Sequence, residues 1–88
     1  MDILLDGKKI IDKKTLYLTL KDQINCDEFY GNNLDALWEV LSSVEEEIKI
    51  IINNQQDLIN NLGAYADLLL ELFHDLKDVN ELVFIEVK

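Results

Sequence analysis

The stretch FYGNNLDALWEVL, residues 29–41, contains the clearest helical pattern in the chain. Its apolar residues recur at i, i+3, i+4 and i+7, the spacing of one face of an α-helix. They are Leu34, Leu37, Trp38 and Leu41. Asn33 comes directly before them and belongs to a residue type that caps helix N-termini. The spacing therefore predicts a helix that begins after Asn33 and buries one apolar face.

Two acidic residues, Asp35 and Glu39, lie four positions apart on this predicted helix. Residues at that spacing share a helix face, where like charges repel each other. Asp35 is in the first turn, where the helix dipole favours an acid by about 0.3–1 kcal/mol. Glu39 is in mid-helix and has no such compensation, which favours a use in a complex. Trp38 lies between them in sequence, and both a core position and a place at the rim of a binding surface are open to it.

Acidic residues are concentrated around the same helix. The 27 residues between Lys21 and Lys49 contain no Lys or Arg and hold eight of the 18 acids. These acids are Asp22, Asp27, Glu28, Asp35, Glu39, Glu45, Glu46 and Glu47. The whole chain has a net charge of −10, which repels nucleic acid and anionic membranes and attracts basic partners. A high net charge can also serve solubility alone, but acidic and basic residues are then usually interspersed over the surface. The clustering favours a docking face for a cationic partner.

The chain of 88 residues has no proline and no linker-like segment, so we expect one domain over residues 1–88. Short apolar runs predict strands at 3–5, 48–52 and 82–87. Apolar residues at helical spacing and helix-end residues predict helices at 14–24, 34–41, 55–61 and 64–78. The run IKIII at 48–52 predicts a strand that is covered on both faces or mostly buried. Strands separated by helices indicate an α/β fold, a three-stranded parallel sheet with helices packed on it.

Residue types needed for other functions are missing or isolated. Cys26 is the only cysteine, so we expect no internal disulfide and a partly buried structural thiol. His74 has no second His or Cys at ligand spacing, which argues against a metal site. The chain has no Ser-His-Asp set and no phosphate-binding glycine loop, and two carboxylates on one helix face do not form a catalytic cleft. We therefore expect no enzyme activity and no cofactor.

The start of the chain and its apolar runs bear on location. MDILLDG has no basic segment of the kind that opens a secretory signal. No apolar run approaches the roughly 18 residues that can span a bilayer. A soluble cytoplasmic protein, monomeric when free, is the expectation.

Residues 30–41 resemble the signature of the barstar family, the intracellular inhibitors of barnase-type secreted ribonucleases. Nine positions match in place: Tyr30, Gly31, Asn33, Leu34, Asp35, Ala36, Leu37, Trp38 and Leu41. The chain is also similar to the family in length and in the order of its elements. The resemblance implies a barstar-like α/β fold, in which a three-stranded parallel sheet is covered by helices.

The resemblance also implies a binding site. In the family, the signature helix and the loop before it plug the nuclease active site, so Asp35 and Glu39 would be the central anions. The other implied partner-binding residues are Phe29, Tyr30, Gly31, Asn33, Trp38, Ser42, Ser43 and, on the following long helix, Asp75. The implied partner is a secreted basic ribonuclease of the barnase type, without nucleic acid or membrane. The alternative is an acidic interaction module or immunity protein that binds a different basic toxin or protein.

Overall fold

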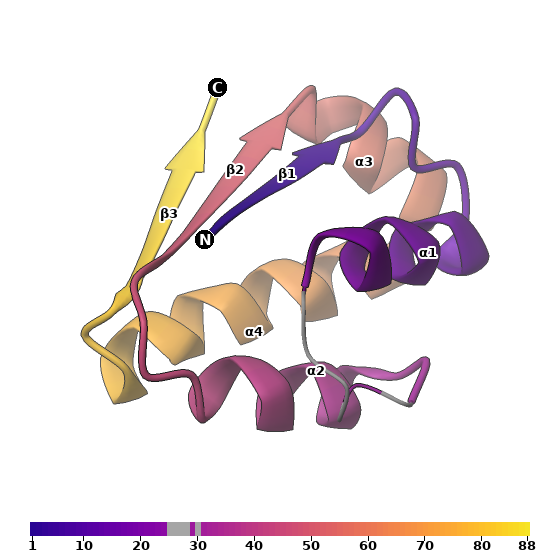
Figure 1. Cartoon of the computed structure of the whole chain (residues 1–88). Helices are drawn as coiled ribbons and strands as arrows, with labels where there is room; N and C mark the ends of the chain where they lie inside the picture. Colours follow the sequence, from indigo (N-terminus) through magenta and orange to yellow (C-terminus); the bar gives the residue numbers. More distant parts are fainter. Residues whose placement is uncertain (25–28, 30) are drawn as a thin grey trace.

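The computed structural model describes residues 1–24, 29 and 31–88, and shows an α/β fold (Figure 1). Its elements are β1 (Asp2–Asp6), α1 (Lys13–Gln23), α2 (Leu34–Ser42), β2 (Ile48–Asn53), α3 (Gln55–Leu62), α4 (Ala64–Val79) and β3 (Val83–Val87). The predicted order of strands and helices is confirmed, with ends that differ by at most one residue. The predictions for Cys26 and Tyr30, and the acids Asp27 and Glu28, lie outside the described residues.

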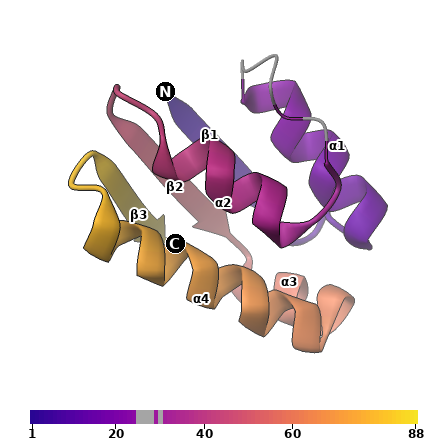
Figure 2. The same cartoon turned by 90° about the horizontal axis from the view of Figure 1, so that it is seen from below.

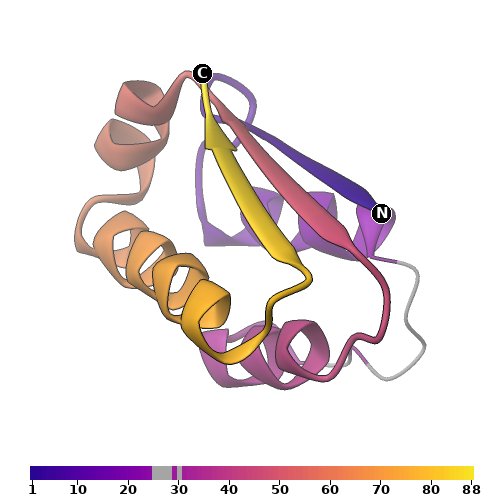
Figure 3. The ribbon, with the colours of Figure 1, turned by 90° about the vertical axis from the view of Figure 1, so that its left-hand side faces the viewer.

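The three strands form one parallel sheet, as predicted, and the structure gives their order as β1-β2-β3. Figures 1 and 3 show α1, α2 and α4 on the same side of this sheet. Burial follows the same division, because side chains alternate between the two faces of a strand. The inward side chains of β1 and β2 are buried: Ile3, Leu5, Ile48, Ile50 and Ile52.

The other face of the sheet is open to solvent. Lys49 points to this face and its Nζ lies 3.0 Å from Glu86 Oε2 of β3. Ile51 is only half-buried. Of the two predicted alternatives for residues 48–52, the strand is mostly buried and is not covered on both faces. The helices all lie on one side, and β2 needs only its alternate isoleucines for the core.

Local capping explains where α1 begins. The Thr15 N–H donates to Asp12 Oδ1 at 2.8 Å, and the Asp12 N–H donates to Thr15 Oγ1 at 3.2 Å, which forms a capping box. Hydrogen bonds from Thr15 hold the pKa of Asp12 below its ordinary value. At the other end of α1, the Gln23 amide donates to the Leu4 carbonyl at 2.7 Å and accepts from the Leu4 N–H at 2.6 Å. The helix is thereby fixed to the edge strand β1.

The loop after β1 packs closely on α3. A Cβ on Gly7 would lie 2.1 Å from the Asn54 carbonyl oxygen and 2.5 Å from the Leu58 nitrogen, so only glycine fits. The Asn61 side chain donates to the carbonyls of Gly7 and Ile10 at 3.0 and 3.2 Å. Asn61 therefore ties α3 to this loop.

Gly63 separates α3 from α4 and has a φ of +61°, a conformation that glycine commonly adopts at the end of a helix. No helix among the described residues has the length and apolar character to cross a membrane.

Candidate functional site

The helix α2 is fixed by a side-chain cap and by its buried face. Asn33 Oδ1 accepts the Ala36 N–H at 2.8 Å, which confirms the predicted cap. Leu37, Val40 and Leu41 are buried in the core. Asp35 and Glu39 are exposed on the opposite side. The same packing that buries the apolar residues therefore presents both acids to solvent.

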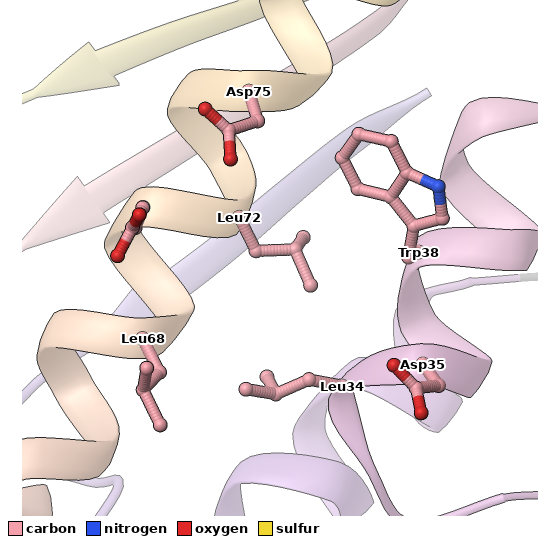
Figure 4. Close-up of a pocket in the computed structure, with 7 residues that line it drawn as sticks. Leu34, Asp35, Trp38, Leu68, Leu72 and Asp75 are labelled. Carbon is pink, nitrogen blue, oxygen red and sulfur yellow. The ribbon is translucent and has the colours of Figure 1, made fainter.

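A pocket of about 290 Å³ lies between α2 and α4, and we call it the acidic pocket. Its lining residues are Leu34, Asp35 and Trp38 from α2, and Leu68, Glu71, Leu72 and Asp75 from α4. Figure 4 shows Leu34 and Trp38 facing Leu68 and Leu72, with Asp35 and Asp75 on the two helices at the margin. An apolar floor is thus bordered by carboxylates from two helices that are far apart in the sequence.

The carboxylates of the acidic pocket are not neutralised by nearby cations. Across residues 1–24, 29 and 31–88, the one carboxylate–ammonium ion pair joins Lys49 and Glu86 on the open face of the sheet. In the same ranges no group of three or more His, Cys, Asp or Glu could hold a metal ion. Three like charges around one pocket repel each other in the free protein, so an incoming cationic group would be favoured by all of them.

The structure brings together three of the residues that the sequence indicated. Asp35, Trp38 and Asp75 line the same pocket, although 37 positions separate Trp38 from Asp75. Trp38 is half-buried, so it belongs both to the core margin and to the pocket. Glu39 is exposed one turn beyond Asp35 but does not line the pocket. It extends the acidic face of α2 outside the pocket.

The two serines and Gly31 have local roles in the structure. The Ser43 hydroxyl donates to the Glu39 carbonyl at 2.7 Å, and the Ser42 hydroxyl donates to the same oxygen at 3.5 Å. Both therefore satisfy the last turn of α2. A Cβ on Gly31 would lie 2.6 Å from Ala36 Cβ, so glycine lets the backbone at residue 31 lie close to the first turn of α2.

Phe29 is a core residue in this structure. Only 6% of it is exposed, and its ring meets Tyr17 edge-on with centroids 6.4 Å apart. The Nζ of Lys21 lies 5.5 Å from the Phe29 ring centroid. Phe29 is therefore packed in the core, and its predicted contact with a partner has no exposed side chain to support it in the free protein.

Sequence reasoning missed Glu71 and Leu68. Glu71 precedes Asp75 by four residues on α4, which repeats the spacing of Asp35 and Glu39 on α2. This repeated spacing was the sequence signal that could have identified Glu71 as a candidate site residue. Leu68 is 52% exposed and forms part of the apolar floor of the pocket. Pairing the two acidic helix faces requires knowing that α2 packs on α4.

Comparison with known proteins gives two similarities that cover most of the chain. A family model described as Barstar (barnase inhibitor) matches residues 1–86. A protein of Bacillus subtilis (strain 168) named "Putative ribonuclease inhibitor YrdF" is 32% identical over 77 residues, which are 86% of this chain and 85% of that protein. Both similarities extend well beyond the signature segment and include the region of α4 that carries Glu71 and Asp75.

Proposed function

Because the chain belongs to the barstar family of barnase inhibitors, we propose that it inhibits a secreted basic ribonuclease of the barnase type by covering the active site with α2 and the preceding loop. The observation that carries this proposal is the acidic pocket. It combines three carboxylates, Asp35, Glu71 and Asp75, with an apolar floor. As an intracellular inhibitor, the protein would act in the cytoplasm on an enzyme that is otherwise secreted.

The chemistry of a ribonuclease active site matches such a surface. The site must collect cationic groups to hold a phosphate and the charge of the transition state. A carboxylate on a rigid helix can take the place of that phosphate and accept charge-assisted hydrogen bonds, which are bidentate where arginine is the donor. Two unit charges about 4 Å apart in a partly desolvated site attract each other by roughly 4 kcal/mol before desolvation costs.

The apolar floor gives the carboxylates a suitable setting. Arginine and lysine have aliphatic stems that pack on apolar surface while the charged head reaches a polar partner. A cationic side chain can lie along Leu68, Leu72 and Trp38 and still meet a carboxylate at the pocket margin. Trp38 also offers a ring face to a guanidinium.

Charge outside the pocket would act on the rate of association. The exposed acids Glu45, Glu46 and Glu47 extend the negative surface beyond the central pair, Asp35 and Glu39. Such a surface steers a basic partner during diffusion, and the effect falls as salt is added. We therefore assign binding strength to the acids at the centre and the on-rate to the acids around them.

The test is an RNA cleavage assay with a set of purified barnase-type ribonucleases and increasing amounts of this protein. We expect stoichiometric inhibition of at least one enzyme, weakened in the Asp35→Asn variant and retained in Glu46→Gln, which removes the same charge away from the pocket. No inhibition of any such enzyme, together with a one-to-one complex with a basic toxin of another activity, would overturn the proposal in favour of a different target.

A further inference from the structure

A second pocket, of about 270 Å³, has the opposite charge and is lined mainly by α1. Its lining residues are Lys13, Lys14, Tyr17, Leu18, Lys21 and Asn32, and we call it the lysine pocket. It is a concentration of cations in a protein of net charge −10, because three of only eight lysines line it.

Two of the three ammonium groups are held in place by neighbouring side chains. Lys13 Nζ lies 4.3 Å from the centroid of the Tyr65 ring, which is a cation–π contact. Lys21 Nζ donates to Asn32 Oδ1 at 2.5 Å. The hydroxyl groups of Tyr17 and Tyr65 form a hydrogen bond of 2.6 Å with each other. The ammonium groups of Lys13 and Lys21 are thus held in position in the free protein.

The position of Lys13 and Lys14 is unfavourable for the free protein. They are the first two residues of α1, where the helix dipole disfavours cations, and the first turn contains no acid. In the described part of the chain, neither forms a carboxylate–ammonium ion pair. The Asp12 carboxylate accepts the capping hydrogen bonds from Thr15 and also attracts Lys14, so it offsets only part of this cost. An external anion would relieve this arrangement.

The lysine pocket and the acidic pocket lie on opposite sides of the start of α2. Asn32 of the lysine pocket is adjacent in sequence to the cap residue Asn33, and Leu34 of the acidic pocket follows it. Tyr65, which supports Lys13, lies one turn before Leu68 on α4. Figure 2 shows α2 between α1 and α4 when the molecule is viewed from the helix side. A partner that covers the start of α2 and extends over both α1 and α4 would reach both pockets.

We propose that the lysine pocket binds a carboxylate side chain that lies next to the cationic active site of the same ribonuclease. This inference rests on the proposed function. Two adjacent pockets of opposite sign would fix the orientation of the enzyme on the inhibitor, since a rotated enzyme would place like charges together. A carboxylate is favoured over RNA as the ligand, because the net charge of −10 and the neighbouring acids repel a polyanion.

The test compares two charge reversals, Lys14→Glu in the pocket and Lys8→Glu outside it. Both change the net charge equally, and Lys8 is an exposed residue of the loop before α1. Lys14→Glu places an acid in the first turn of α1, so its thermal midpoint should not fall below that of the wild type. Lost binding in this variant could not then be attributed to unfolding. Dissociation constants would be measured against a ribonuclease that the wild type inhibits.

We expect Lys14→Glu to weaken binding by at least about tenfold and Lys8→Glu by less than about twofold. Equal effects of the two variants, with inhibition by the wild type intact, would overturn the inference and leave the proposed function standing.

A second measurement needs no ribonuclease. The acetylated and amidated peptide Asp-Glu-Asp is titrated into the labelled free protein while NMR shifts are followed. Saturable shifts at Lys13 and Lys14 that persist in Lys8→Glu and vanish in Lys14→Glu would support carboxylate binding, even if no ribonuclease were inhibited and the proposed function failed. Shifts produced by a short RNA and not by the peptide would contradict the inference.

Discussion

Replacing Asn33 by alanine removes the side-chain cap of α2, the helix that carries Asp35. The cap is one hydrogen bond of 2.8 Å from the Ala36 N–H to Asn33 Oδ1. Asn33 is exposed, so its replacement leaves no cavity and the lost cap is the main change. Replacing such a cap by alanine costs about 1 kcal/mol, within a range of roughly 0.5–2. For a domain of 88 residues this corresponds to a fall of about 5 °C in Tm.

Asn33→Ser is the matched control, because a serine hydroxyl can accept the same N–H. Calorimetry or circular dichroism melts of the three proteins should place Asn33→Ser within about 2 °C of the wild type and Asn33→Ala clearly below both. Asn33→Ala should also bind a target ribonuclease more weakly, since the first turn that presents Asp35 is less firmly held. Equal Tm values for the alanine and serine variants would refute the reasoning that this cap sets the start of α2.

Two further predictions concern packing around α1 and the loop before it. Gly7→Ala should destabilise the fold by about 1–3 kcal/mol or more in urea unfolding, because its Cβ would overlap the backbone at Asn54 and Leu58; a cost below about 0.5 kcal/mol would contradict this contact. Tyr17→Phe should cost about 1 kcal/mol through the lost hydrogen bond to Tyr65. Burial and that hydrogen bond raise the pKa of Tyr17 above its ordinary value, so the native state keeps the proton more firmly than the unfolded state. Wild-type stability should therefore be complete below about pH 10 and fall above it, and the alkaline fall should be shallower in Tyr17→Phe.

The order of elements was predictable because each has a local signal. The period of the apolar residues identifies α2 and α4, and Asn33 and Gly63 mark helix ends with the caps that the structure shows. Whether helices pack on one face of β2 or on both could not be predicted in the same way. A run of isoleucines is compatible with one buried face or two, and only the placement of the helices on one side decides that Ile51 faces outward.

The candidate site was only partly predictable, because it depends on how two helices pack. Asp35 and Trp38 could be found from the spacing in α2. Asp75 came from the family resemblance, and Glu71 was missed, since a pocket formed between α2 and α4 leaves no local pattern. Phe29 was predicted to contact the partner. The sequence alone does not decide whether an aromatic residue next to a binding helix contacts a partner or packs in the core, and the structure places Phe29 in the core.

The central claim is that a cationic active site binds the acidic face of α2 beside the pocket shared with α4. The most direct measurement is the binding kinetics of four proteins with an inhibited ribonuclease at low and high salt. They are the wild type, Asp35→Asn, Glu39→Gln and Glu46→Gln, and thermal melts serve as the folding control. We predict large increases in the off-rate for Asp35→Asn and Glu39→Gln, because cationic groups are left buried and unpaired. Glu46→Gln should change mainly the on-rate, and that change should shrink as salt shortens the Debye length to about 8 Å at 0.15 M. Small and equal effects of all three substitutions would mean a diffuse acidic surface and would contradict the claim.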